Sequence, residues 1–384
     1  MNNPTSQRLR FGAAFFDALL TRYSGYHRNM SDTSPELSVL IVAYKSQTDL
    51  ARCLPSLLEQ DYQDFEIVIV DNAPEHDTLW LRQHYPQVRI IENAANTGYA
   101  GGNNLAIDAA NGRFLLFLNP DTVLHEGALG QLMQTARANP DAFVNSKLLN
   151  PDGTINASGL VMHYTGISTC RGLYQNPARY RGVEPIPLVS GAAFVATKDV
   201  ITDTGGFQEL YFMYLEDIEL SLRAKVLGYR ILCDNDAVIT HDYSQNLTAN
   251  KFFYLERNRL LTLLIIASRR TLVRMSVALL LTELATWAYA FLKGGAYVKT
   301  RWRVLTWFFR ETSTWQTLRR DLQQRKRTGD EVWFADTLEA LPFDQLVDNT
   351  KVASWLDRLT RPLYVLLRPQ LVSSAPPKHP SEAS

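Results

Sequence analysis

The chain has 384 residues, and its 39 Lys and Arg residues balance its 39 Asp and Glu residues to a formal net charge of zero. This balance excludes the strongly basic surface of a general nucleic-acid binder. The cysteines Cys53, Cys170 and Cys233 form neither a CxxC pair nor a disulfide framework, which indicates a reducing compartment and no structural zinc site. A chain of this length favours one large α/β domain with an appendage.

The N-terminal segment is predicted to be helical. Apolar residues recur at helical spacing before about Met30, which predicts an amphipathic helix over residues 1–30. Charged residues interrupt its apolar positions, so we do not expect a signal peptide. A polar, proline-containing linker then leads to the main domain, which is expected to span residues 36–245.

Short apolar runs and helical patterns alternate through the next part of the chain. The expected strands are Leu37–Val42, Phe65–Val70, Val88–Ile91 and a run that begins at Phe114 and stops before Asn119. Helices are expected from a capping box at Ser46 and Asp49 to about Leu58, and again at Asn104–Ala110. This alternation predicts an α/β fold with a doubly wound parallel sheet.

Further elements complete the predicted domain. They are a strand at Ala192–Ala196, a helix at Glu216–Leu227 and short strands at Ile231–Cys233 and Val238–Ile239. Residues 163–187 are rich in Gly, Tyr, Arg and Pro and show no period. We expect a long loop there, and such loops in compact domains are often functional lids.

Polar residues follow the ends of three predicted strands. Ala43 and Tyr44 follow the first strand, Asp71 follows the second, and Asp121 follows the strand at Phe114. Ligands of parallel sheets bind at the carboxyl ends of the strands, so these residues are expected to meet there. A carboxylate at this edge suits a divalent cation that holds a phosphorylated substrate. Helix capping by Asp121 and turn formation by Asp71 are the competing interpretations.

Two further segments are candidates for the same site. Residues 96–104 contain three glycines and three asparagines, which permit close backbone approach to a ligand and supply neutral donors and acceptors. Their spacing is neither the GxGxxG fingerprint nor a Walker loop. Glu216 and Asp217 open a predicted helix after the aromatic run 211–214. They are either a catalytic pair or a solvated acidic helix N-terminus.

Taken in order, these motifs resemble the family 2 glycosyltransferases, and within them the bacterial rhamnosyltransferases that build surface polysaccharides. The resemblance covers about Leu37 to Arg259 and rests on five segments: VLIVAY, VDN, NTGYAGGNN, LNPD and YLEDIEL. It implies a GT-A fold, in which a Rossmann-like mixed sheet binds a nucleotide-diphospho-sugar. The N-terminal helix and a C-terminal helical region would then be appendages to this domain.

The resemblance also implies a role for individual residues. The residues implied to bind the nucleotide are Ala43, Tyr44, Asp71, Asn96, Gly98, Tyr99, Asn103 and Asn119. Asn119-Pro120-Asp121 occupies the place of the family's DxD motif, so Asp121 would ligate Mg²⁺ or Mn²⁺, although Asn119 replaces the first carboxylate. Asp217 would be the catalytic base with Glu216 beside it. His241 matches a histidine that approaches the metal or the diphosphate, and an ordinary polar role is the alternative.

The C-terminal region, residues 246–370, is predicted to be helical and to associate with a membrane. Met275–Leu292 is long enough to span a bilayer, but Glu283 near its centre and basic residues on both flanks argue against spanning. Basic and aromatic residues interleave in Lys299–Arg310, which suits a helix in the headgroup region, and Trp355–Leu367 is a second candidate. The alternative is a soluble helical bundle. The tail over 371–384 is expected to be disordered.

The function that follows is an inverting, metal-dependent transfer of a sugar to a lipid-linked or surface glycan. The expected donor is dTDP-rhamnose, and a UDP-hexose is the alternative. A non-catalytic nucleotide- or glycan-binding subunit with the same fold is the alternative from another class, and Asn119 is the residue that keeps it open. The expected location is the cytoplasm, peripheral on the inner face of the cell membrane. The sequence does not specify the linkage or the oligomeric state.

Overall fold

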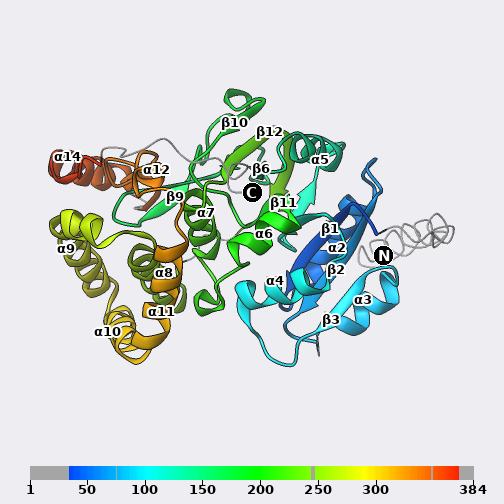
Figure 1. Cartoon of the computed structure of the whole chain (residues 1–384), viewed down its shortest axis with the longest axis horizontal. Coiled ribbons are helices and arrows are strands. Elements are labelled where there is room, and N and C mark those ends of the chain that lie inside the picture. The colour runs from blue at the N-terminus through cyan, green and yellow to red at the C-terminus, as the bar shows by residue number, and fades with distance from the viewer. Residues whose placement is uncertain (1–33, 75, 244–246, 347–348, 372–384) are drawn as a thin grey trace, which may run out of the picture. The chain divides into compact units, whose positions relative to one another are not determined.

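The computed structural model describes residues 34–74, 76–243, 247–346 and 349–371 (Figure 1). From Pro35 onward the chain forms one compact unit. The helix predicted over residues 1–30 lies outside the described residues, as does the predicted tail apart from its first residue.

The first half of the domain is the predicted parallel α/β unit. Its strands are β1 (Leu37–Ala43), β2 (Phe65–Asp71), β3 (Arg89–Glu92) and β4 (Phe114–Leu118). They lie in the order β4-β1-β2-β3, with parallel pairing of β1 to both β2 and β4 and of β2 to β3. The strand order therefore reverses beside β1, and such a reversal opens a crevice at the carboxyl ends of the strands.

Helices connect these strands. They are α2 (Gln47–Leu58), α3 (Thr78–His84) and α4 (Gly98–Ala109). α2 begins after Ser46 as predicted, but the Ser46 hydroxyl accepts the Tyr44 amide at 3.1 Å and makes no capping hydrogen bond. α4 begins at Gly98, six residues before the predicted start at Asn104, so most of the predicted glycine-rich loop is the first part of a helix.

The second half of the sheet is mixed, so the parallel sheet predicted from the alternating pattern describes only the first half. The strand β11 (Ala193–Thr197) runs antiparallel to β4 and to β6 (Ala142–Leu149), whereas β12 (Arg230–His241) runs parallel to β6. The short strands β5 (Thr122–Leu124), β7 (Ile155–Ala157) and β10 (Val183–Pro185) lie at its margins. This mixed sheet is that of the GT-A fold implied by the resemblance.

Some elements had no counterpart in the sequence prediction. These are α5 (Ala128–Ala138), α6 (Lys198–Thr204) and β6. β6 is buried at every residue, including the polar run Asn145-Ser146-Lys147, so it shows neither the alternation of a surface strand nor a continuous apolar run. β12 is one strand interrupted by an irregular register, where two separate short strands were predicted.

The segment predicted to be a long loop contains short ordered pieces. They include the hairpin of β8 (Leu160–Met162) and β9 (Ser168–Cys170), and a 3₁₀ turn at Pro177–Arg179. Beside the hairpin, the Tyr164 hydroxyl donates to the Tyr364 carbonyl at 2.7 Å. The segment is thus attached to the C-terminal region, and its role as a lid stays a prediction.

Helices cover both faces of the sheet (Figure 1). One core lies between the sheet and α2 and α5, and a second lies between the sheet and α4, α6 and α7 (Glu216–Val226). The opposite side of α7 packs into a third core with the C-terminal helices. α7 therefore contacts both the sheet and the appended region, and its first turn carries Glu216 and Asp217.

The C-terminal region is helical, as predicted. Its helices are α8 (Ala249–Ile266), α9 (Arg269–Lys293), α10 (Gly295–Arg310), α11 (Thr312–Arg325), α12 (Glu331–Phe334), α13 (Phe343–Leu346) and α14 (Thr350–Leu367). Among the described residues, α9 is the one helix that is long and apolar enough to cross a bilayer by length and composition alone.

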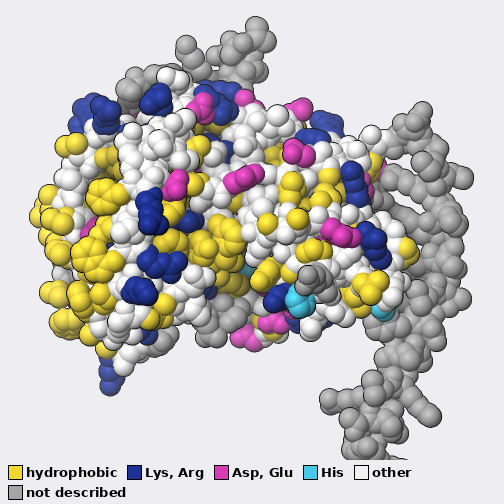
Figure 2. Space-filling model, turned by 90° about the horizontal axis from the view of Figure 1, so that it is seen from below, with side chains coloured by type: hydrophobic (Ala, Val, Ile, Leu, Met, Phe, Trp, Pro, Cys, Tyr) yellow, Lys and Arg dark blue, Asp and Glu magenta, His cyan; other side chains and the backbone are white. Residues whose placement is uncertain are grey.

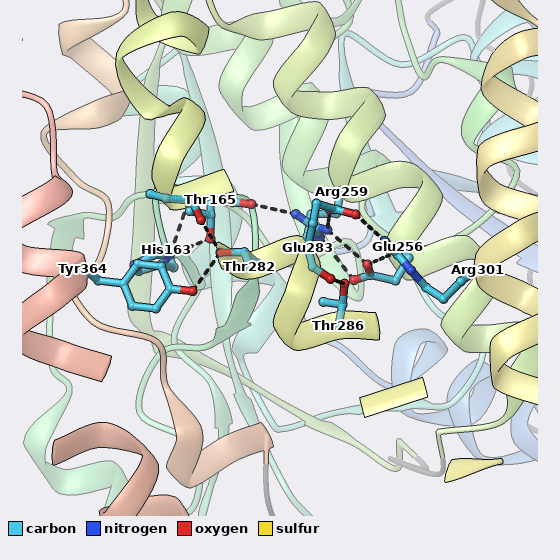
Figure 3. Close-up of polar contacts among 10 residues, drawn as sticks. His163, Thr165, Glu256, Arg259, Thr282, Glu283, Thr286, Arg301 and Tyr364 are labelled. Atoms are coloured by element: carbon cyan, nitrogen blue, oxygen red, sulfur yellow. Dashed lines mark hydrogen bonds and ion pairs between the residues drawn. The ribbon is translucent and has the colours of Figure 1, made fainter. Parts of the chain in front are cut away.

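A buried charge network joins α8, α9 and α10 (Figure 3). Arg259 pairs with Glu256 at 3.1 Å and also with Glu283, and Arg301 pairs with both glutamates. Burial opposes the charged form of Glu256, but Arg259 and Arg301 outweigh it and lower the pKa of that carboxyl. Removing one partner of such a network leaves an uncompensated buried charge, so the network holds α9 against its neighbours.

Candidate active site

The loop between β4 and β5 meets the end of β12. His241 pairs with Thr122 in the β12–β5 register, and its Nε2 atom lies 3.3 Å from Oδ1 of Asp121. The geometry is not that of a hydrogen bond, because both atoms are buried without a hydrogen-bond partner, as is Oδ1 of Asn119. Three unsatisfied ligand atoms in one region are costly unless something binds between them.

These atoms fit a divalent cation. Carboxylate and amide oxygens suit Mg²⁺ and Mn²⁺, and imidazole nitrogen is a common metal ligand. Among the described residues, no group of three or more His, Cys, Asp and Glu side chains could hold a metal ion. The protein thus supplies only some of the ligands that such an ion needs, which is typical of an ion that also binds substrate phosphates. Asp121 is not a helix cap, because the strand β5 follows it.

Asp217 is held at the start of α7 by backbone amides. Its Oδ2 atom accepts the Gly191 amide at 2.8 Å and its Oδ1 atom accepts the Ile218 amide at 2.8 Å. Burial raises the pKa of Asp217, and the two amide hydrogen bonds oppose that rise by favouring the ionised form. Asp217 is therefore a partly buried carboxylate with a fixed orientation.

Glu216 has a different environment. It is 6% exposed, and its Oε2 atom is buried without a hydrogen-bond partner. Burial, and next to it the charge of Asp217, raise the pKa of Glu216 well above its ordinary value. Glu219 one turn later is also buried, in an ion pair of 2.7 Å with Arg223. These residues are not a solvated acidic helix N-terminus, which was the competing interpretation of this segment.

The two candidate carboxylates belong to one site. The Asn119 amide donates to the Ala192 carbonyl at 2.9 Å, and the adjacent Gly191 donates to Asp217. Gly191 and Ala192, which directly precede β11, thus link the loop of Asn119 and Asp121 to the first turn of α7. Burial raises the pKa of Tyr243, and the negative charges of Asp121 and Asp217 add to that rise, so both carboxylates act on one phenol.

The predicted nucleotide residues gather at the ends of β1 and β2. Ala43 pairs with Asp71 in the β1–β2 register, and the exposed Tyr44 follows. Asp71 is fully buried, and its two oxygens accept the Ala73 amide at 2.9 Å and the Thr78 hydroxyl at 2.7 Å. These contacts fit the turn interpretation of Asp71, and its role toward a nucleobase stays a prediction.

The glycine-rich segment also lies at this edge. The Asn72 amide donates to the Gly98 carbonyl at 3.0 Å, and the Asn96 side chain accepts the Gly98 amide at 2.9 Å. Gly98 has φ +71°, and a Cβ there would lie 2.2 Å from the Phe212 carbonyl oxygen. Here the glycine permits close approach of another protein segment.

Two other residues of the segment are directed into the protein. The Tyr99 hydroxyl donates to the Gly191 carbonyl at 2.6 Å, so this side chain reaches the backbone that holds Asp217. Asn103 is 1% exposed, and its side chain donates to the Tyr99 carbonyl at 3.0 Å. The structure thus brings Tyr99 to the catalytic side, and it leaves Asn103 in a supporting position within α4.

Gly191 is a functional candidate that sequence reasoning missed. A Cβ at this position would lie 3.3 Å from both Oδ2 of Asp217 and the Tyr99 hydroxyl, closer than side chains normally tolerate. The only local signal was a Ser-Gly pair directly before the strand predicted at Ala192. That signal cannot show which residue the glycine faces, because Asp217 is 26 residues away in the chain.

The fold and this site define the class of protein. The sheet and its helices are those of the GT-A nucleotide-sugar transferases, and the chain aligns with the crystal structure of GalNAc-T7 with UDP, GalNAc and Mn²⁺ at a TM-score of 0.50. That alignment has 14% sequence identity and covers 61% of this chain and 48% of the other, so it supports the fold alone. Residues 38–194 match the family described as glycosyl transferase family 2.

Curated relatives match the same part of the chain. O-antigen biosynthesis protein RfbC of Myxococcus xanthus is 30% identical over 56% of this chain and 18% of its own length. The low-salt glycan biosynthesis hexosyltransferase Agl10 of Haloferax volcanii is 28% identical over 50% and 62%. The N-acetylglucosaminyl-diphospho-decaprenol L-rhamnosyltransferase of Mycobacterium tuberculosis is 26% identical over 63% and 86%. The chain therefore spans less than two thirds of the first two relatives.

The buried Glu216 makes a prediction for stability. Below about pH 4.5, its ordinary pKa, both the folded and the unfolded chain carry the proton. Above pH 4.5 the Glu216 carboxyl loses its proton in the unfolded chain but keeps it in the folded chain. The free energy of unfolding therefore falls as the pH rises, until the pH reaches the raised pKa of Glu216 in the folded protein. Glu216→Gln removes this loss. We expect urea denaturation to show a variant close to wild type near pH 4.5 and more stable than wild type near pH 7.5.

The matched control is Glu126→Gln, which changes an exposed glutamate in the same way. Its difference from wild type should be the same at both pH values. If Glu216→Gln behaves like this control, the carboxyl is already ionised in the folded protein.

Proposed function

We propose that this protein transfers a sugar from a nucleotide-diphospho-sugar to a hydroxyl of a lipid-linked or surface glycan, with inversion at the anomeric carbon. One observation carries the proposal. The backbone from Gly191 to Ala192 joins an amide-held carboxylate, Asp217, to the loop of Asn119 and Asp121, whose two unsatisfied oxygens lie in one region with the unsatisfied Nε2 atom of His241. This reaction needs a general base for the acceptor hydroxyl and a site that holds the diphosphate of the donor. In our proposal the two lie on either side of one strand end.

Asp217 is the general base in this proposal. Its carboxylate takes the proton of the acceptor hydroxyl as that oxygen bonds to the anomeric carbon, and the bond from this carbon to the nucleoside diphosphate breaks. The Gly191 and Ile218 amides keep the carboxylate oriented and favour its ionised form. Glu216 is buried, and its burial disfavours the ionised form, so in this proposal it does not act as a second nucleophilic carboxylate as in retaining glycosidases. Direct displacement with inversion follows.

Asn119, Asp121 and His241 would hold Mg²⁺ or Mn²⁺ in this scheme. Bound there, such an ion offsets the negative charge that develops on the leaving diphosphate. Asn119 supplies an oxygen without charge, so the binding of the ion depends more on Asp121 and on the phosphates of the donor. The nucleotide itself would lie along the ends of β1 and β2, between Tyr44 and the first turn of α4.

The donor and the acceptor follow from chemistry and from relatives. A named rhamnosyltransferase with a diphospho-decaprenol acceptor, matched over 86% of its length, supports rhamnose as the sugar and a lipid-linked acceptor, and dTDP-rhamnose is the donor that we propose. A UDP-hexose is the competing donor, since a glucosyltransferase of Escherichia coli that uses UDP-Glc is 24% identical over 58% of this chain. Thermal-shift titration with dTDP-, UDP- and GDP-sugars in Mn²⁺ separates these donors.

A membrane surface is part of the proposed function. Exposed apolar residues form one stripe on α9 (Val273, Val277, Leu280 and Leu284) and one on α14 (Trp355, Leu359, Leu363 and Leu366). Figure 2 shows hydrophobic side chains gathered with Lys and Arg at the end of the molecule that holds the C-terminal helices. Exposed apolar area of this kind, mixed with cations, suits the headgroup region of an anionic bilayer.

The same helices argue for a peripheral arrangement. Glu283 lies midway along α9, and the buried arginines Arg259 and Arg301 hold it. A spanning α9 would have to break this network or carry its charges into the bilayer, and both are costly. We therefore place α9 on the cytoplasmic membrane surface, with its exposed stripe toward the lipid, where it is close to a lipid-linked acceptor.

Loss of the base should abolish transfer. Asp217→Asn keeps the shape of the side chain but cannot accept the proton, so we expect transfer to fall by about 100-fold or more while the affinity for the donor nucleotide is unchanged. The measurements are product formation with radiolabelled donor and calorimetric binding of the nucleotide. Asp199→Asn, an exposed residue on α6, is the control. If wild type and Asp217→Asn both bind nucleotide and neither transfers, the binding-subunit alternative is correct.

Loss of the metal ligand should remove the effect of the metal on binding. With Asp121→Ala we expect Mn²⁺ no longer to increase the affinity for a nucleoside diphosphate, because its one charged oxygen ligand is gone. Calorimetry with and without Mn²⁺ measures this. Asp242→Ala is the local-charge control, since this neighbouring carboxylate is paired with Arg52 at 2.9 Å. An equal metal effect in wild type and Asp121→Ala would contradict the assignment.

Charges placed in the apolar stripes should release the protein from membranes. For the double variant Leu280→Glu and Leu359→Glu we expect vesicle binding to fall by about tenfold or more, since each exposed leucine contributes about 1.5–3 kcal/mol when it enters lipid. Co-sedimentation with vesicles that contain anionic lipid measures the effect. Leu79→Glu on α3 is the control, because Leu79 is 69% exposed on the sheet domain. Equal binding by all three proteins would contradict the docking surface.

A further inference from the structure

The segment that precedes the proposed base has a strained backbone. Phe212 (φ 62°), Tyr214 (φ 66°) and Leu215 (φ 61°) all have positive φ angles, and none of them is glycine. Such conformations are strained and persist only where surrounding contacts impose them. Glu216 and Asp217 follow directly, so whatever imposes this conformation also sets the direction of the first turn of α7.

Asn258 on α8 makes the contacts that impose it. Its Nδ2 atom donates to the carbonyls of Tyr211 at 3.1 Å, Met213 at 3.0 Å and Tyr214 at 2.6 Å. An amide nitrogen has two hydrogens, so one of them is shared between two carbonyls. The Oδ1 atom accepts the Arg257 guanidinium at 2.8 Å, which fixes the orientation of the amide. Asn258 is fully buried, and both polar atoms of its side chain form hydrogen bonds with neighbouring protein groups.

The opposite side of the segment is held by the sheet domain. The Phe212 carbonyl accepts the Ala100 amide of α4 at 3.1 Å, and Gly98 leaves room for that carbonyl because it has no Cβ. The segment is thus fixed between α4, which belongs to the proposed nucleotide side, and α8, which belongs to the appended helices. A change at Asn258 would remove the hydrogen bonds of α8 to the carbonyls of Met213 and Tyr214, while Arg257 would still donate to the Tyr211 carbonyl at 2.5 Å.

We infer that Asn258 is a positioning residue for the proposed base, and that the appended helices therefore supply part of the active-site framework. The inference rests on the proposed function, because it assigns a role toward Asp217. Without Asn258, residues 212–215 can relax to ordinary right-handed conformations. The first turn of α7 then rotates, and the Asp217 carboxylate loses its hydrogen bond from the Gly191 amide.

This loss has two chemical consequences. A base displaced by about 1 Å from the acceptor hydroxyl can slow the reaction by about 100-fold. A carboxylate that loses a backbone amide donor also loses stabilisation of its ionised form, so its pKa rises. The base must be ionised to act, and the acid limb of the pH–rate profile moves to higher pH as a result. A purely structural role of Asn258 would not move this limb.

The test is Asn258→Asp, which exchanges the donating amide for an oxygen of nearly the same size. That oxygen faces three carbonyls and repels them. The matched control is Asn235→Asp, because Asn235 is also fully buried and donates to the Gly182 carbonyl at 3.1 Å and to Glu184 at 2.8 Å, on strand β12. Both variants are compared as full-length protein with wild type and with Asp217→Asn.

For Asn258→Asp we expect kcat to fall by about 100-fold with unchanged donor affinity, the acid limb to move to higher pH, and faster hydrogen exchange of the amides over residues 211–218. Asn235→Asp should show a similar loss of melting temperature without these changes. The inference is overturned if exchange over 211–218 is unchanged, or if kcat falls equally in both variants with an unmoved acid limb. The exchange result stands even if wild type transfers no sugar, whereas full activity of Asp217→Asn would overturn only the proposed base.

Discussion

The hydrogen bond from the Gly191 amide to the Asp217 carboxylate connects the two halves of this protein. Gly191 precedes β11, the antiparallel strand that separates β4 from β6, and Asp217 opens the helix that packs against the appended region. The absence of a side chain at residue 191 favours this close approach, since a Cβ there would lie 3.3 Å from both Oδ2 of Asp217 and the Tyr99 hydroxyl. The proposed base depends on this contact, which places the carboxylate beside the backbone to which Asn119 also bonds through Ala192.

The C-terminal helices contact the sheet domain next to the proposed base and also carry the proposed membrane surface. α8 contacts α7 and holds the strained segment before it, while the charge network ties α8 to α9 and α10. The apolar stripes lie on α9 and α14, on the same body. A continuous set of packed helices thus leads from the proposed membrane surface to the proposed base. An acceptor held at a lipid surface would thus meet a base that is oriented by the same helices that contact the lipid.

Much of the site could be predicted from the sequence, and the particular residues show why. Strand ends are visible as apolar runs that stop at polar residues, so the positions of Ala43, Asp71 and Asp121 followed from the rule for parallel sheets. The order of motifs identified the family, which the match over residues 38–194 confirms. Two local predictions were wrong. The strand β6 was missed because it carries polar residues although it is fully buried, and the start of α4 was missed because its glycines, which permit tight packing of the helix, are typical of a loop.

The sequence by itself determined the fold class, the family and the residue types available at each strand end, because these depend on short-range patterns of apolar and polar residues. Only the tertiary structure decided which of these side chains are free to act. Asp71 has both oxygens occupied by neighbours, Glu216 is buried away from water, and Asp121 and His241 converge without satisfying one another. Burial and hydrogen-bond partners come from segments far apart in the chain, so no local pattern can encode them.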